Sequence, residues 1–312
     1  MASLPHPVQY QGSKRNLAAH ILRFLPSRVQ RLVEPFAGTA AISIAAVAEQ
    51  SARNFWLNDL NKPLIELFKL IIENPGDIAD AYADIWSEQH SNSIEHYFEV
   101  RKKFNKTKDP KLLIYLLARC VKGAVRYNSE GLFNQSPDKR RKGTQPATMR
   151  KNIEGVSRLL KGKCQFTCLD YRQVLTKVQN HDFVYMDPPY QGVCMNKDSR
   201  YFSGIDFEDF VLALEDLNER GIAFAISYDG RLGSKTFGRI LPESLGLKRI
   251  EIEVGRSSQS TLLGREEKTI ESLYLSPDLI SRQLVDLTSY ICKAPTQLTL
   301  LEKHGNFSTA TR

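Results

Sequence analysis

Several features that often reveal a class of protein are scarce in this sequence. The five cysteines are scattered and include no Cys-x-x-Cys pair, so neither a disulfide framework nor a zinc site is predicted. No apolar run approaches membrane-spanning length, and the first residues lack the apolar core of a signal peptide. Internal repeats and low-complexity segments are also missing. These absences favour a cytoplasmic protein with no metal and no membrane partner.

Basic residues outnumber acidic ones. The 312 residues contain 43 Lys and Arg against 35 Asp and Glu, which gives a formal net charge of +8. A basic excess favours polyanions, so nucleic acid leads the candidate partners. With 42% hydrophobic residues, the chain can form one large domain or a domain that carries an insertion.

The most informative stretch is the apolar run 181–186, which ends at Asp187-Pro188-Pro189-Tyr190. The run predicts a buried strand of a parallel sheet, and the two prolines turn the backbone out at the carboxyl edge, where open α/β sheets bind ligands. The carboxylate, the proline carbonyls and the tyrosine ring suit a planar substrate with an exocyclic amine. The alternative is a simple strand-ending turn.

A βα unit precedes this stretch in the sequence. It consists of strand 31–34, a turn with one glycine, Gly38, and the alanine-rich helix 42–48. Such a glycine allows the backbone to approach a nucleotide cofactor closely. One glycine is not the dinucleotide fingerprint, so a purely structural turn is the alternative.

An acidic residue follows the next strand. Asp59 ends strand 54–57, where a carboxylate is placed to accept hydrogen bonds from both hydroxyls of a ribose. The same residue could instead cap the helix that begins near Pro63. Upstream, Gly12 and Lys14 precede helix 16–25; Lys14 either reaches an anion or is a solvated lysine at a helix start.

The central block, 62–162, predicts a helical insertion. Helical periodicity marks 63–72, 77–86, 94–104 and 111–121, and a glycine- and asparagine-rich stretch, 123–134, follows. Basic residues 139–142 and 150–151 then flank what we expect to be a polar loop. We interpret the block as a subdomain that contacts phosphates, with a solvated basic loop as the alternative.

The α/β pattern resumes after the block. We expect strands at 164–169, which ends at Asp170, and at 222–226, with helices at 174–178 and 207–219. Strands 249–254 and 269–275 are predicted to form an antiparallel edge hairpin joined by a polar loop. A tail, 278–312, carries one expected helix, 280–291.

Taken in order, the motifs resemble the Dam-like class of S-adenosylmethionine-dependent DNA adenine N6-methyltransferases. The motifs that carry the resemblance are Tyr10-Gln-Gly-Ser-Lys14, Val33-Glu-Pro-Phe-Ala-Gly38, Asn58-Asp59-Leu-Asn61, Arg126-Tyr-Asn-Ser-Glu-Gly131-Leu-Phe-Asn134, Asp187-Pro-Pro-Tyr190 and Phe224-Ala-Ile-Ser227. The chain departs from many members in lacking a second glycine after Thr39.

The resemblance implies a Rossmann-like, methyltransferase-type sheet, mostly parallel with an antiparallel edge hairpin. Residues 1–61 and 163–277 would form the catalytic domain and 62–162 a mainly helical DNA-recognition insertion. The implied catalytic residues are Asp187, Pro188, Pro189 and Tyr190. The implied cofactor-binding residues are Tyr10, Lys14, Glu34, Phe36, Gly38, Asp59, Asp170 and Asp187. The residues assigned to DNA are Arg126, Asn128, Asn134, Lys139, Arg140, Arg141 and Lys142.

The resemblance also implies a reaction. A target adenine would be flipped out of duplex DNA, held by the Asp187 loop and methylated on N6 by S-adenosylmethionine, without a metal. We expect a monomer, and a cognate restriction endonuclease is a candidate partner. The side chains leave open cytosine N4, RNA or a protein amide as the target, and a catalytically silent DNA-binding protein on the same scaffold.

Overall fold

A single sheet organises the chain. The computed structural model describes residues 4–26, 29–90, 92–189, 205–232, 235–237, 239–256 and 268–283. Its strands are β1 (Val29–Glu34), β2 (Ala52–Asn58), β3 (Cys164–Thr167), β4 (Asp182–Met186), β5 (Ala223–Leu232), β6 (Lys235–Phe237), β7 (Lys248–Arg256) and β8 (Lys268–Leu275).

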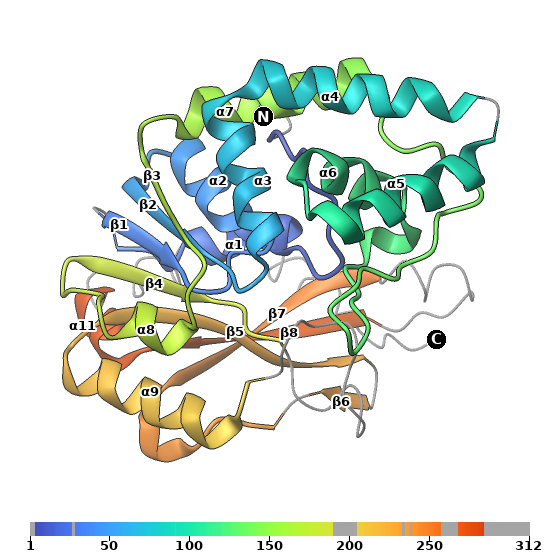
Figure 1. The fold of residues 1–312 in the computed structure, drawn as a ribbon. Helices are drawn as coiled ribbons and strands as arrows, with labels where there is room; N and C mark the ends of the chain where they lie inside the picture. Colours follow the sequence, from blue (N-terminus) through green and yellow to red (C-terminus); the bar gives the residue numbers. More distant parts are fainter. Residues whose placement is uncertain are drawn as a thin grey trace, which may run out of the picture.

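The strand order is β3-β2-β1-β4-β5-β8-β7, with β6 paired to β5 (Figure 1). Strands β1 to β5 run parallel to their neighbours in that order, whereas β8 lies antiparallel between β5 and β7. The expected fold class, including the antiparallel edge hairpin, is confirmed. The order reverses between β1 and β4, and a ligand cleft forms at such a switch point.

Helices cover both faces of the sheet (Figure 1). One face carries α1 (Ala18–Leu22), α2 (Ala41–Ala48), α3 (Lys62–Glu73) and α7 (Pro146–Leu160), and the other carries α8 (Tyr171–Leu175) and α9 (Phe207–Glu219). A last helix, α11 (Pro277–Gln283), packs on β5. The expected tail helix extends past residue 283, and that part lies outside the described residues.

The central block adds α4 (Pro75–Ser87), α5 (Ser93–Thr107) and α6 (Pro110–Arg119), with short 3-10 turns at Glu88–His90 and Val121–Gly123; two further 3-10 turns lie outside the block, at Lys14–Asn16 and Glu243–Leu245. Its apolar core is continuous with that of the sheet, because buried residues of α3, α6 and α7 join those of α1 and α2 in one cluster. The insertion is therefore built onto the sheet. The proposed domain boundaries stay a prediction.

Two expectations for local structure are wrong. Helix α8 begins at Tyr171 rather than near residue 174, because the Asp170 side chain accepts a hydrogen bond from the backbone N–H of Arg172 and caps the helix. The polar loop expected to extend to Arg150 is instead largely α7. Its buried face follows Met149, Ile153 and Val156, a helical spacing that the surrounding basic residues obscured.

Candidate active site

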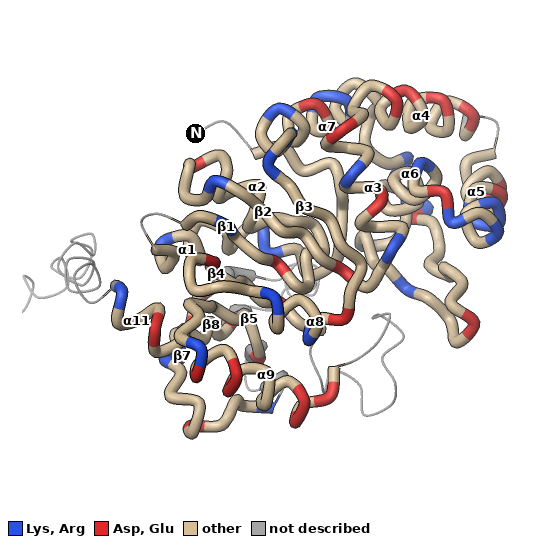
Figure 2. The backbone as a smooth tube through the Cα atoms, turned by 60° about the vertical axis from the view of Figure 1, so that its left-hand side comes forward, with Lys and Arg blue, Asp and Glu red and all other residues tan. Residues whose placement is uncertain are grey.

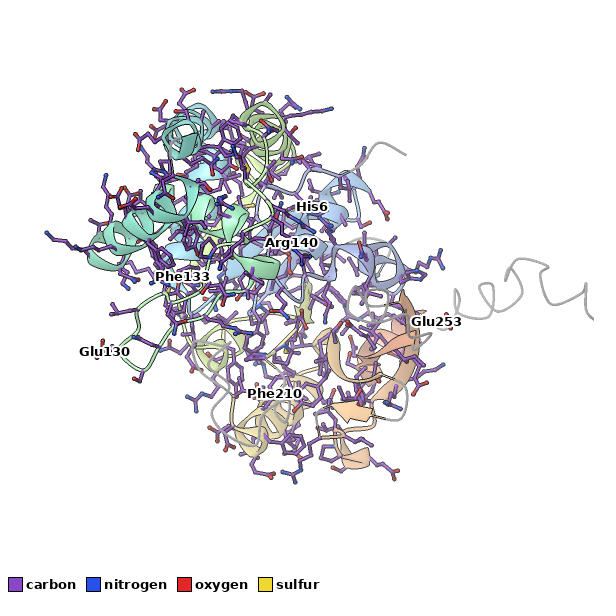
Figure 3. The ribbon with its side chains drawn as sticks, turned by 90° about the vertical axis from the view of Figure 1, so that its right-hand side faces the viewer. His6, Glu130, Phe133, Arg140, Phe210 and Glu253 are labelled. Atoms are coloured by element: carbon purple, nitrogen blue, oxygen red, sulfur yellow. The ribbon has the colours of Figure 1, made fainter. Side chains whose placement is uncertain are left out.

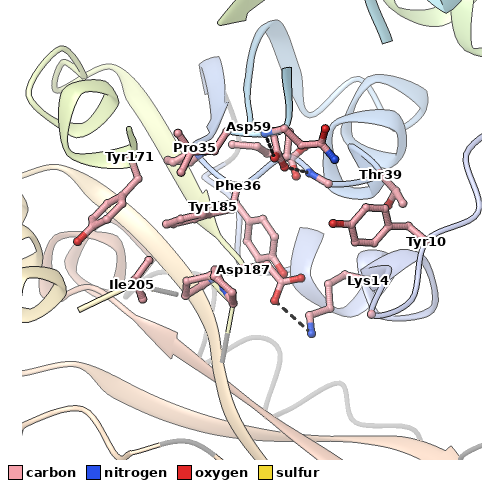
Figure 4. A pocket seen from close by; sticks show the side chains of 18 of the residues that line it. Tyr10, Lys14, Pro35, Phe36, Thr39, Asp59, Tyr171, Tyr185, Asp187 and Ile205 are labelled. Carbon is pink, nitrogen blue, oxygen red and sulfur yellow. Dashed lines mark hydrogen bonds and ion pairs between the residues drawn. The ribbon is translucent and has the colours of Figure 1, made fainter. Parts of the chain in front are cut away.

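A cavity of about 350 Å³ opens at the carboxyl ends of the parallel strands (Figure 4). Every residue expected to bind the cofactor lines this cavity: Tyr10, Lys14, Glu34, Phe36, Gly38, Asp59, Asp170 and Asp187. Pro188 and Pro189 line it as well. Tyr190 lies outside the described residues, so its position beside the cavity stays a prediction.

The wall of the cavity is held together by one buried amide. Asn58, at the end of β2, donates from its side chain to the carbonyls of Pro35 and Leu169, both at 2.9 Å. Its side-chain oxygen accepts from the Leu169 N–H and from the Thr167 hydroxyl, both at 2.8 Å. The amide thus joins the carboxyl ends of β1, β2 and β3. Asn58 belongs to the motif Asn58-Asp59-Leu-Asn61, in which only Asp59 was expected to have a role.

Asp59 supports the turn that follows β1. Its carboxylate accepts from the backbone N–H of Gly38 at 3.0 Å and from that of Asn61 at 2.9 Å. Gly38 has a φ of +49°, a left-handed conformation that favours glycine. Burial raises the pKa of Asp59, and the two backbone hydrogen bonds oppose that shift. Asn61, rather than Asp59, occupies the N-cap position of α3.

Glu34 is a buried acid in the cavity wall. Its Oε1 accepts from the backbone N–H of Ser43 at 2.9 Å and from the Ser43 hydroxyl at 2.5 Å. Burial raises the pKa of Glu34 to about 7 against the opposing effect of these bonds, and the charge of Asp187 adds to the rise. Near neutral pH this carboxyl can therefore gain or lose a proton.

Asp187 follows β4 and pairs with a buried lysine. The Nζ of Lys14 lies 3.2 Å from Asp187 Oδ1 and 2.7 Å from Glu271 Oε2 on β8. Lys14 is 6% exposed, so its interpretation as a solvated helix-start lysine is wrong. Figure 4 shows the Lys14 side chain pointing at the Asp187 carboxylate, with a dashed line that marks the ion pair.

Aromatic rings and a salt bridge form another part of the wall. The rings of Phe36 and Tyr171 lie 5.3 Å apart between centroids. Arg172 pairs with Asp170 at 2.9 Å and with Asp209 of α9 at 2.8 Å. The hydrogen bond from Arg172 is the main cause of the lowered pKa of Asp170. Asp170 therefore lies at the cavity, as expected, while its carboxylate also organises α8.

The residues assigned to DNA lie on two loops between α6 and α7. The first, 126–134, is a narrow hairpin: Asn134 N donates to the Arg126 carbonyl at 3.0 Å, and Tyr127 pairs with Phe133. Asn128 closes its turn, because its side-chain oxygen accepts from the N–H groups of Glu130 and Leu132. In Figure 3, Glu130 marks the outer tip and Phe133 lies nearer the helices.

Helix α5 anchors this hairpin. Asn105 exchanges two hydrogen bonds with the backbone of Phe133, at 2.9 and 2.8 Å. Lys108 donates to the Gly131 carbonyl at 2.9 Å, and Arg101 donates to the carbonyls of Asn134 and Gln135. These contacts fix the position of Arg126 and Asn134. The sequence analysis did not single out these three residues, because their partners lie more than 20 residues away.

The second loop, 138–144, carries the basic cluster, and Lys139, Arg140, Arg141 and Lys142 are all exposed on it. A buried arginine holds its backbone: Arg119 donates to the carbonyls of Asp138 and Arg141. Gln89 donates to the Lys142 carbonyl and Tyr82 to that of Thr144. The loop thus presents its charges from a fixed backbone. Figure 2 shows further Lys and Arg positions along α5.

Metal sites and membrane-spanning helices concern the part of the chain that the structure describes. Within it, no group of three or more His, Cys, Asp or Glu residues is arranged to hold a metal ion. Of the helices described, none combines the length and apolarity needed to cross a membrane.

The fold and the cavity are typical of α/β enzymes that bind a ligand at the switch point of the sheet, where the strand order reverses. The profile of the D12 class of N6 adenine-specific DNA methyltransferases matches residues 10–257. The chain therefore belongs to this family. Membership indicates an adenine-specific DNA methyltransferase, and no comparison favours cytosine N4.

Individual relatives agree. A DNA N-6-adenine-methyltransferase of Escherichia phage P1 is 28% identical over 71% of this chain, which spans only 29% of the phage protein. A type II methyltransferase of Lactococcus lactis subsp. cremoris is 25% identical over 85% of this chain and 94% of its own length. A DNA adenine methylase of Vibrio cholerae is 28% identical over 70% of this chain and 79% of its own.

The raised pKa of Glu34 predicts a pH effect on stability. Folding raises this pKa from 4.5 to about 7, so the unfolded chain loses the proton first and rising pH lowers the stability between these values. Glu34→Gln removes the titratable group, so the variant should not lose this stability as the pH rises. Its side-chain oxygen can still accept the two hydrogen bonds from Ser43. From pH 4.5 to pH 8, the unfolding free energy of the variant should gain up to ~3 kcal/mol on the parent. Urea denaturation at several pH values measures the unfolding free energies of both proteins. If the two plots of unfolding free energy against pH were parallel, the raised pKa of Glu34 would be contradicted.

Proposed function

We propose that this protein transfers a methyl group from S-adenosylmethionine to N6 of an adenine flipped out of duplex DNA. The observation that carries the proposal is that Asp187 and the two prolines after β4 open into the same cavity as Asp59 at the end of β2. A carboxylate for the target amine and a carboxylate for a cofactor ribose thus share one space. We further propose that the enzyme is a monomer and that it acts in the cytoplasm.

The cavity residues fit S-adenosylmethionine. Asp59 offers carboxylate oxygens that can accept from ribose hydroxyls, Phe36 and Tyr171 offer aromatic faces, and Glu34 and Asp187 offer negative charge to a cation. When bound, S-adenosylmethionine supplies an electrophilic methyl group on a positively charged sulfur.

The Asp187 loop would hold the target base. Asp187 and the Pro188 carbonyl accept the two N–H groups of the amine, which orients the nitrogen lone pair for in-line attack. Proton loss from the amine follows transfer, because the nitrogen becomes acidic as the methyl arrives. Tyr190 would stack on the flipped base, which offsets part of the few kcal/mol that flipping costs.

The two anchored loops would bind the duplex. The exposed basic residues of loop 138–144 suit phosphates, and Arg126 and Asn134 on the hairpin suit base edges or the backbone. Asn128 has committed its side-chain oxygen to the turn, so only its amide nitrogen remains for DNA. The Lactococcus relative is named a type II methyltransferase, which supports a restriction endonuclease as a partner.

Replacing Asp59 tests the cofactor site. Asp59→Asn keeps the shape of the side chain but removes the charge, so binding of S-adenosylmethionine should weaken by about 1.5–3 kcal/mol, through loss of a charge-assisted hydrogen bond. Isothermal titration calorimetry measures this. The control is Asp80→Asn, which removes an exposed carboxylate on α4. Equal affinity in Asp59→Asn and the control would remove the ribose assignment.

Replacing Asp187 tests the reaction. Asp187→Ala should lower the single-turnover rate by at least about 10²–10³, because a preorganised group at the developing positive charge is lost. The measurement uses unmethylated genomic DNA with labelled cofactor, followed by separation of the methylated nucleosides. DNA binding should persist in the variant. Label in N4-methylcytosine, or full activity of Asp187→Ala, would refute the proposed reaction.

Neutralising the basic loop tests DNA binding. Arg140→Gln with Arg141→Gln should weaken binding to all duplexes and lower the log–log salt slope by about one unit per lost phosphate contact. The matched control is Lys161→Gln with Lys163→Gln. These lysines lie at the amino end of β3, whereas the cavity opens at the carboxyl ends of the strands. Fluorescence anisotropy at several salt concentrations measures both slopes. If the two double variants kept the parent slope, loop 138–144 would be a solvated face.

A further inference from the structure

Three segments that are distant in the sequence meet at one ammonium group. Lys14 lies in the turn before α1, Asp187 follows β4, and Glu271 lies on β8 of the antiparallel hairpin. The Lys14 Nζ is 3.2 Å from the Asp187 carboxylate and 2.7 Å from that of Glu271. Lys14 is 6% exposed, while the two carboxylates are 22% and 23% exposed. Among the described residues that line the cavity, Glu271 does not appear.

Among the described groups that meet here, carboxylates outnumber ammonium groups by two to one. One carboxylate would suffice to neutralise a buried lysine, yet two face it, and the one outside the cavity is the nearer. If Asp187 were the sole partner, the ammonium would neutralise it and compete with the target amine for its oxygens. With Glu271 sharing the ammonium, the trio carries a net charge of about −1 when all three groups are ionised.

We propose that Glu271 is a positioning residue for methyl transfer: it holds Lys14 so that Asp187 remains a negatively charged acceptor directed at the target amine. This inference rests on the proposed function, since it assigns Asp187 to the amine. Glu271 acts only through Lys14, because it touches neither the cavity nor Asp187 in the contacts described. Its effect should therefore disappear when Lys14 is removed.

A double-mutant cycle tests this dependence. Glu271→Gln should lower the single-turnover rate of adenine methylation by about 10- to 100-fold, as loss of an outer partner of an active-site group typically does. Affinities for S-adenosylmethionine and for DNA should stay within about threefold, because the variant leaves the cavity lining intact. In a Lys14→Met background, Glu271→Gln should lower the rate no further.

The control is Glu251→Gln, which removes another carboxylate of the same hairpin, one paired with Arg249 on β7. It should methylate at the parent rate. If Glu271→Gln fails to fold, Glu271→Asp replaces it: the charge is kept but drawn back from Lys14, so the rate should still fall at unchanged affinities.

The outcomes separate the two proposals. A parent enzyme that methylates adenine while Glu271→Gln keeps the parent rate overturns the role of Glu271 alone. So does a rate loss of equal size with and without Lys14, because it would indicate a structural effect of Glu271. A parent enzyme that methylates no adenine overturns the proposed function, and the role of Glu271 with it.

Discussion

The side-chain amide of Asn58 sets the geometry on which the rest of the site depends. Its four hydrogen bonds join the ends of three neighbouring strands. Both N–H groups and both acceptor positions of the amide are satisfied by these bonds. The turn after β1, Asp59 after β2 and Asp170 after β3 consequently lie on one wall. The sheet alone would bring these ends to one edge, but the amide fixes their separations.

The protein separates two electrostatic environments. The acids Glu34, Asp59 and Asp187 line the cavity together with one buried lysine, Lys14, which pairs with Asp187; this excess of acids suits a cation and an amine that becomes positive during reaction. Outside, exposed basic side chains stand on a backbone held by Arg119, which suits a polyanion. Contacts such as that of Gln9 with Thr144 tie the basic loop to the segment that carries Tyr10 into the cavity. The acidic cavity and the basic loop are thereby held in a fixed relation to each other.

The sequence predicts the site well where residues are tied to strand ends. Asp59, Asp170 and Asp187 follow strands of a parallel sheet, so periodicity and turn residues place them at one edge. The pairing of Lys14 with Glu271 could not be predicted, because it joins residues more than 250 positions apart through the register of β8 against β5. Helix α7 was missed although its apolar spacing is present. Asn105 on α5 and Lys108 just after it were missed because their partners lie more than 20 residues away and because amides and lysines are usually solvated.

The turn after β1 shows how tertiary contacts override local preference. Ala40, which follows Thr39 where many family members carry a second glycine, has a φ of +50°, a conformation that costs an alanine roughly 1–2 kcal/mol. It keeps this conformation because both ends of the turn are held: Ala37 N donates to the Asn58 carbonyl at 2.8 Å, and Ala40 N donates to the Ala37 carbonyl at 2.6 Å. The strand ends therefore impose the turn, and the backbone holds a left-handed conformation at Ala40 without a second glycine.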